Sequence, residues 1–426
     1  MGKRFSRREF LGTAVIATAG CATGKRVAPA TAPRAAPAPS GRATIRVGVI
    51  GCGARGTVLL QDLLQRQRNA AGVHVAGVCD VYAPRLERAK AMARAAFAYR
   101  DWQELVDLED IDAIVIATPN HWHAPMTVAA LETGKDVYCE TPMARTVPEA
   151  LAVRDCARRT GRVCQIGATE VAAGRWEVVR SLIGGEVVGP VRWIHANPAP
   201  KRLLLAESEP MPDTLDWAAF TGNGPPIAFD PDRYLHWRRY WDYSGGAALD
   251  SFYPVFAALL EATGPELPER VSAAGGVAVP DARETPDMFM TTIEYPHGKT
   301  IVSATSVARR RGPIAVIRGE HADVEVHRRK VVVTPEEAYK DDLREQYGWD
   351  RPVVFGAPAS RDLLTDWLAR IRDRTQCLCD AELGHHAMLA CGMGVEAYRQ
   401  RTSLSWDRDK KRMVPAPPRV ARAQAG

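Results

Sequence analysis

Apolar residues follow two rhythms in the first part of the chain. Short runs rich in β-branched residues are separated by stretches in which apolar residues recur at helical spacing. The runs cover residues 45–50, 73–79, 113–117, 136–139 and 163–166, and the helical stretches cover 57–66, 124–132 and 147–159. Buried strands that alternate with helices are typical of a doubly wound parallel sheet. We therefore predict an α/β domain over residues 44–167.

A different pattern follows, and it predicts a second domain over residues 168–412, with a tail at 413–426. Strand-like segments lie at residues 271–279, 288–295, 300–307, 315–318 and 331–333. Apolar spacing predicts amphipathic helices at 362–374 and 381–399, and we expect the second to pack back on the first domain. A chain of 426 residues is too long for one hydrophobic core, which agrees with two domains.

The first 43 residues lack such periodicity. Ser6-Arg7-Arg8-Glu9-Phe10-Leu11 opens an apolar stretch that ends at Gly20. This stretch is too short to span a bilayer and suits an export signal. The pattern resembles twin-arginine signals, so we expect a signal at 1–21, an Ala/Pro-rich linker at 22–43, and periplasmic localisation through the twin-arginine machinery. Cys21 is either the acylated residue of a lipid anchor or is removed with the signal.

Charge and cysteine content exclude some classes of function. Residues 1–46 hold nine of the 56 basic residues and one of the 50 acidic ones, so the remainder carries a net charge of −2. A slightly acidic body gives no electrostatic reason to bind nucleic acid. Of the nine cysteines, Cys377 and Cys379 form the one close pair, without a second pair or histidines at zinc spacing. We predict neither a metal site nor a disulfide framework.

A glycine-rich turn follows the first predicted strand. Gly51-Cys52-Gly53-Ala54-Arg55-Gly56 precedes a helix, and Asp80 ends the next strand. Glycines let this turn approach a pyrophosphate, which the free N–H groups of the helix N-terminus can bind. The acidic residue can accept hydrogen bonds from ribose hydroxyls and would repel a 2′-phosphate. The pattern indicates a Rossmann-type dinucleotide site that favours NAD over NADP, although Arg85 lies near.

Polar segments follow two further strands of the predicted sheet. Ligands gather at the carboxyl ends of parallel strands, so residues in these segments are candidates for contact with cofactor or substrate. His121 and His123 both lie in the segment that follows the predicted strand at 113–117. For each of them, packing on a loop is the alternative to contact with a ligand. The candidate cofactor contacts beyond the glycine turn are Thr118, Pro119, Asn120, His123 and Glu140.

Several segments together resemble the Gfo/Idh/MocA oxidoreductases, the relatives of glucose–fructose oxidoreductase and inositol dehydrogenase. They are the glycine turn, ATPNHWH, GKDVYCETPM, HWRRYWDYSGG and ELGHHAMLACGMGVEAYRQRTSLSWD. The resemblance covers about residues 44–412. It implies a Rossmann domain, then an α+β domain whose open, mostly antiparallel sheet carries the substrate face and forms homo-oligomers, and a sugar or cyclitol substrate.

Two positions depart from the family pattern. Where members have Glu-Lys-Pro, this chain has Glu140-Thr141-Pro142, and threonine cannot replace an ammonium in moving a proton. Where the family motif is Asp-x-x-x-His, the chain retains Asp250 but has Pro254 at the histidine position. Both usual proton-handling residues are therefore replaced.

Three functions remain open. The first, which we favour, is an NAD-dependent oxidoreductase of a sugar or cyclitol in which another group moves the proton. Tyr253 with a lowered pKa is the first candidate, packing being its alternative. Asp250 is a candidate as the retained aspartate of the family motif, in which it helps orient the histidine. His236, Tyr240 and Asp242 are further candidates. The second is an NAD-dependent glycosidase or lyase that oxidises its substrate transiently, although the Tyr-Pro-x-His pattern of the acetylgalactosaminidases is not found. The third is a non-catalytic binding protein.

Overall fold

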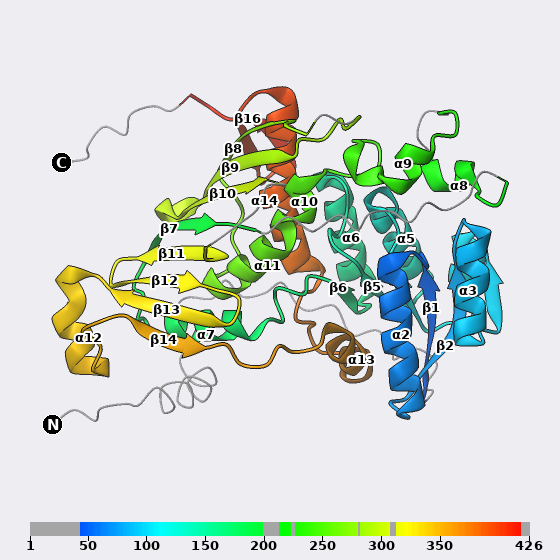
Figure 1. Cartoon of the computed structure of the whole chain (residues 1–426), viewed down its shortest axis with the longest axis horizontal. Coiled ribbons are helices and arrows are strands. Elements are labelled where there is room, and N and C mark those ends of the chain that lie inside the picture. Colours follow the sequence, from blue (N-terminus) through cyan, green and yellow to red (C-terminus); the bar gives the residue numbers. More distant parts are fainter. Residues whose placement is uncertain (1–42, 199–212, 223–225, 280–281, 307–311, 419–426) are drawn as a thin grey trace.

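A parallel sheet organises the N-terminal domain (Figure 1). The computed structural model describes residues 43–198, 213–222, 226–279, 282–306 and 312–418, so the predicted signal, Cys21 and all but the last residue of the predicted linker lie outside the described residues. The strand order is β3-β2-β1-β4-β5-β6. Their bounds are β1 (Ile45–Ile50), β2 (Val73–Cys79), β3 (Phe97–Tyr99), β4 (Ala113–Ile116), β5 (Asp136–Cys139) and β6 (Cys164–Ile166).

Helices cover both faces of this sheet. Their bounds are α2 (Ala54–Arg68), α3 (Ala83–Ala93), α4 (Trp102–Val106), α5 (Asn120–Glu132) and α6 (Val147–Thr160). Helices α2 and α3 pack on one face, whereas α5 and α6 pack on the other. Burial on both faces explains the continuous apolar runs of the strands. The segment that ends at His123 is not an extended loop as expected, because α5 already begins at Asn120.

The second sheet has ten strands and is mostly antiparallel, so the predicted fold class is confirmed. Its order is β14-β13-β12-β11-β7-β10-β9-β8-β15-β16, and β7 and β10 form its one parallel pair. The strands are β7 (Val191–Ala196), β8 (Arg270–Gly276), β9 (Met288–Glu294), β10 (Thr300–Ser306), β11 (Ala315–Gly319), β12 (Ala322–Val326), β13 (Lys330–Pro335), β14 (Val353–Gly356), β15 (Leu404–Asp407) and β16 (Arg412–Pro415).

Three long helices lie between the two sheets or against the second one, as Figure 1 shows: α7 (Gly174–Gly184), α11 (Phe252–Thr263) and α14 (Ala381–Gln400). Helix α14 contacts α6 as well as α11 and β8, which confirms that it packs back on the first domain. Helix α13 (Leu363–Asp373) also returns there, because its residues join the core formed by α2 and α3. A short helix, α12 (Lys340–Tyr347), lies beside the far end of the second sheet (Figure 1).

A small lobe covers the edge of the first domain where strands β1 and β2 end. It contains α8 (Trp217–Thr221), α9 (Pro231–Leu235) and a loop that leads to α10 (Ala247–Asp250). Tyr82 pairs with Leu215 in an isolated β-bridge, which attaches the lobe directly after Asp80. A separate aromatic core holds the lobe together, formed by Tyr82, Leu215, Phe220, Tyr234, Tyr240 and Tyr243. None of the helices in the described ranges has the length and hydropathy that crossing a membrane requires.

Candidate functional site

The glycine turn after β1 brings two backbone segments into contact. Gly51 has φ +87°, a conformation that favours glycine. A Cβ on Gly56 would lie 1.7 Å from the Gly51 carbonyl oxygen, so only glycine lets α2 begin this close to β1. No side chain caps the N-terminus of α2 at Gly53. The first N–H groups of the helix therefore remain able to bind an anion such as a pyrophosphate.

Asp80 lies beside this turn with its carboxylate fixed. Its Oδ2 accepts a hydrogen bond from the Cys52 amide at 2.7 Å, and its Oδ1 accepts one from the Tyr82 amide at 2.8 Å. The carboxylate is thus held at the end of β2, where an adenosine ribose would bind. Arg85 approaches the same turn, because its Nη1 lies 3.3 Å from the position of a Cβ on Gly53. The glycine geometry, the uncapped helix and the fixed carboxylate together fit a dinucleotide.

Arg55 and Glu140 join the glycine turn to the end of β5. The Arg55 Nε donates to Glu140 Oε1 at 2.8 Å, and Nη2 lies at the same distance. Burial by itself disfavours the charged guanidinium, but the Glu140 carboxylate outweighs it and raises the pKa of Arg55. The structure therefore brings these two predicted contacts together as an ion pair at the carboxyl edge of the sheet. Thr141, which follows Glu140, is 8% exposed.

Of the two histidines of α5, His123 is buried and His121 is half-buried. His123 places Nδ1 2.6 Å from the Pro142 carbonyl oxygen and Nε2 2.8 Å from that of Thr118, so it connects the segments that follow β4 and β5. His121 Nε2 lies 2.8 Å from the Phe220 carbonyl oxygen of the lobe, and burial lowers its pKa to about 4. Both side chains therefore hold backbone segments in place. This is the packing role that the sequence left open as the alternative to contact with cofactor or substrate.

A polar cluster connects the two domains at this edge. Asn120 Nδ2 donates to Ser244 Oγ at 3.2 Å and lies 3.5 Å from Asp250 Oδ1. Asp250 Oδ2 pairs with Arg238 Nε at 3.0 Å. Arg238 and Ser244 were not predicted, although both belong to the HWRRYWDYSGG segment that the sequence singles out. The cluster places the retained aspartate of the second domain next to Asn120 of the first.

Tyr253 does not have the environment that a proton-transfer role requires. Its side chain is fully buried on α11, and its hydroxyl donates to the Gly384 carbonyl oxygen at 3.0 Å. Burial raises its pKa well above the usual value, so the expected lowered pKa is wrong. Pro254 is buried beside it in the first turn of α11, where proline is tolerated. The contacts of Tyr253 are those of a side chain that packs in the core, which was the alternative to a role in proton transfer.

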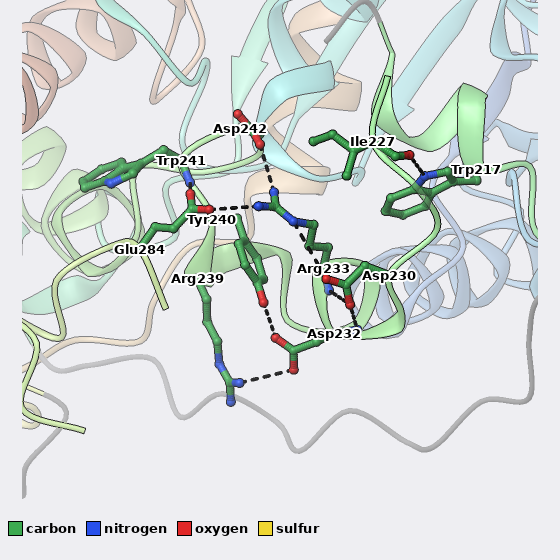
Figure 2. Close-up of polar contacts among 10 residues, drawn as sticks. All are labelled: Trp217, Ile227, Asp230, Asp232, Arg233, Arg239, Tyr240, Trp241, Asp242 and Glu284. Atoms are coloured by element: carbon green, nitrogen blue, oxygen red, sulfur yellow. Dashed lines mark hydrogen bonds and ion pairs between the residues drawn. The ribbon is translucent and has the colours of Figure 1, made fainter. Parts of the chain in front are cut away.

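Two further candidates of the lobe, Tyr240 and Asp242, belong to an ion-pair network, which Figure 2 shows. Arg233 pairs with Asp242 and Glu284, both at 2.9 Å. The Tyr240 hydroxyl donates to Asp232, and its pKa is raised first by burial and then by this carboxylate. Asp242 and Tyr240 therefore hold the lobe together. His236 Nε2 lies 3.7 Å from Asp232, and its side chain is 28% exposed.

Family models match both domains of the chain. Residues 45–168 match the oxidoreductase family's NAD-binding Rossmann fold, and residues 226–405 match its C-terminal alpha/beta domain. The chain belongs to the Gfo/Idh/MocA oxidoreductase family. The predicted cofactor is thereby confirmed as NAD, bound by the Rossmann domain. The described part of the chain contains no group of three or more His, Cys, Asp or Glu residues that could hold a metal ion.

Curated relatives of this family member include proteins named for another activity. An alpha-N-acetylgalactosaminidase of Shewanella oneidensis is 34% identical over 215 residues, which cover 44% of this chain and 46% of the relative. A glycosyl hydrolase family 109 protein of Shewanella baltica matches to the same extent. The chain thus matches slightly less than half the length of these relatives.

Solved structures share the fold over most of the chain. A levoglucosan dehydrogenase in complex with NADH and levoglucosan has a TM-score of 0.65 at 20% identity, covering 88% of this chain and 100% of that one. An aldose–aldose oxidoreductase of Caulobacter crescentus has a TM-score of 0.63 at 18% identity, covering 85% and 99%. At these identities the likeness concerns the fold alone.

Proposed function

We propose that this family member is an NAD-dependent oxidoreductase that acts on a CH–OH group of a sugar, a cyclitol or a related derivative. The contact between Asn120 and Asp250 carries this proposal, because it joins the cofactor edge of the first domain to a carboxylate of the second. Fold neighbours whose names include a sugar or aldose substrate support it. NAD, when bound, supplies the acceptor for a hydride from the substrate carbon.

The residues of the site divide the remaining tasks. Gly51, Gly56 and the N-terminus of α2 bind the pyrophosphate, and Asp80 binds the adenosine ribose. His236 accepts the hydroxyl proton in this proposal, because an imidazole can take up and release a proton near neutral pH and this side chain is partly exposed. Asp250 orients the substrate from its fixed position beside Arg238.

A second candidate function is an NAD-dependent glycosidase that oxidises its sugar transiently. The curated relatives named alpha-N-acetylgalactosaminidase and glycosyl hydrolase favour it. Tyr253-Pro254 of this chain also matches the first half of the Tyr-Pro-x-His pattern, but Phe256 stands at the histidine position. Phe256 cannot transfer a proton, so this function would need another acid or base.

One assay separates these functions. The purified protein is incubated with NAD and a panel of sugars, polyols and aryl glycosides, while NADH and released aglycone are measured. Accumulation of NADH supports the oxidoreductase. Aglycone release without net NADH supports the glycosidase and overturns our first proposal. NAD binding without either product leaves the non-catalytic binding protein.

We also infer that the protein is exported by the twin-arginine route after folding. All eight cysteines of the described residues are free and buried, so a folded protein protects them in an oxidising compartment. NAD binding before export gives a second reason to fold first. Arg7→Lys with Arg8→Lys should leave the precursor in the cytoplasm, whereas export of this variant would refute the route. Mass spectrometry of the mature N-terminus decides whether Cys21 carries lipid.

A further proposal concerns the open face of the ten-stranded sheet, where we expect a second copy of the chain to bind. Trp193, Met288 and Met290 are 38%, 45% and 55% exposed on strands β7 and β9. Large exposed apolar residues on one sheet face favour a protein interface. Light scattering should give an oligomer, and Trp193→Asp with Met290→Asp should give a monomer. A monomeric wild-type protein would contradict this interface.

A further inference from the structure

Two contacts hold Arg238 beside Asp250, the retained aspartate of the second domain. Its Nε pairs with Asp250 Oδ2 at 3.0 Å, and its guanidinium carbon lies 4.0 Å from the centre of the Trp237 ring. The Arg238 side chain is 38% exposed. Within the described part of the chain, its terminal Nη groups form no hydrogen bond or ion pair. The guanidinium is therefore fixed at one end and presents free donors at the other.

Neighbouring carboxylates do not compete for these donors. Asp232 accepts from the Tyr240 hydroxyl and pairs with Arg239, as Figure 2 shows. Asp242 and Glu284 both pair with Arg233 (Figure 2). These three carboxylates thus already have cationic partners other than Arg238. Any group that binds the Nη atoms of Arg238 must come from outside this network.

The chemistry of a guanidinium limits which chemical group can bind the Nη atoms of Arg238. Its planar fork matches two oxygen atoms of one carboxylate, and it stays charged at physiological pH, so it cannot act as the base. A phosphate dianion would need more positive charge than Arg238 supplies, because Asp250 already offsets part of it. A single carboxylate suits both the geometry and the charge.

We propose that Arg238 binds a carboxylate of the substrate, so that the substrate is a sugar acid or cyclitol acid and not a neutral polyol. This inference rests on the proposed oxidoreductase function and specifies its substrate class. Asp250 connects the bound acid to the cofactor edge, because its other oxygen faces Asn120. Arg238 is then the residue that determines specificity, and it orients one hydroxyl-bearing carbon toward the cofactor.

The test compares sugar acids with their neutral counterparts. NADH formation is measured with glucuronate and glucose, galacturonate and galactose, and gluconate and sorbitol. In each pair of which a member reacts, we expect the wild-type kcat/KM to be at least about ten-fold higher for the acid than for its neutral counterpart. A charge-assisted hydrogen bond supplies a difference of this size. Arg238→Gln should remove this preference, mainly through KM for the acid. Arg344→Gln, which removes an equal charge from exposed α12, should retain it.

A second variant separates recognition from folding. Arg238→Gln leaves Asp250 buried without its cation and can reduce stability, whereas Arg238→Lys keeps the charge and loses only the planar fork. We expect Arg238→Lys to bind NAD normally, to retain its melting temperature and to lose several-fold of the preference. An equal loss for acids and neutral sugars would overturn the proposal.

The oxidoreductase function and the recognition of a substrate carboxylate would be refuted by different results. NADH formed from neutral sugars at equal or higher kcat/KM than from acids would refute carboxylate recognition and leave the oxidoreductase function intact. No NADH from either class, with NAD still bound, would refute the oxidoreductase function and the substrate class together.

Discussion

Replacing Gly56 by alanine should strongly weaken NAD binding while the rest of the fold remains. The added Cβ would lie 1.7 Å from the Gly51 carbonyl oxygen and 2.8 Å from its carbon, both backbone atoms that no rotamer change can move. Real Cβ atoms do not approach closer than 3.0 Å, so the start of α2 must retreat by about 1.3 Å. A misplacement of about 1 Å can reduce the function of a site about 100-fold. We expect at least that loss in NAD affinity.

Gly184→Ala is the matched control for this substitution. Gly184 also lies in a helix, has no atom within 4 Å of its added Cβ, and does not have a positive φ. We expect this variant to bind NAD like wild type and to gain slightly in stability, because alanine favours helix. Calorimetric titration with NAD gives affinity, and thermal unfolding without NAD gives stability. Wild-type affinity in Gly56→Ala would refute the close approach of α2 and β1 as the basis of the cofactor site.

Three other substitutions test particular residues. Asp80→Ala should reduce the NAD-over-NADP preference at least about ten-fold in calorimetric titrations, because the ribose loses an acceptor and the 2′-phosphate loses a repelling charge; an unchanged ratio would show that Asp80 does not read the ribose. Tyr253→Phe should keep wild-type turnover and lose about 1 kcal/mol of unfolding free energy, since its buried hydroxyl donates to the Gly384 carbonyl oxygen; a large fall in turnover would restore it as a catalytic candidate. Burial lowers the pKa of His385 to about 3, so the unfolded chain binds this proton first and stability falls as pH drops from about 6.5 toward 3. His385→Gln should lose less stability between pH 7 and 5 than wild type in chemical unfolding, and equal losses would contradict this origin.

The sequence predicts best those elements whose residue pattern is determined locally, without partners from distant parts of the chain. Strands β1, β2 and β5 have the predicted bounds, because strands buried on both faces form uninterrupted apolar runs. The glycine turn was also predictable, since its steric requirement excludes every other residue at Gly56. Strands β7, β12, β14, β15 and β16 were not predicted. Short strands of an open sheet depend on partners that lie far away in the sequence.

Side-chain environment at the site was less predictable than position. A tyrosine beside a replaced histidine suggests proton transfer, but only the structure shows that the Tyr253 hydroxyl faces α14 inside the core. Arg238 and Arg239 are indistinguishable in sequence, yet one pairs with Asp250 and the other with Asp232. Such differences arise from how the loop folds against α10 and from the partners that tertiary structure supplies.

The two family departures have a common physical consequence at this edge. Thr141 and Pro254 remove the amine and the imidazole that the family pattern would place here, while Asp250 remains buried. A buried carboxylate without a cation is costly, so its retention requires a new partner. Arg238 is that partner, and a guanidinium cannot exchange a proton as an imidazole does. In the proposed function, proton transfer therefore falls to another residue, and the Arg238 guanidinium adds a permanent positive charge beside Asp250.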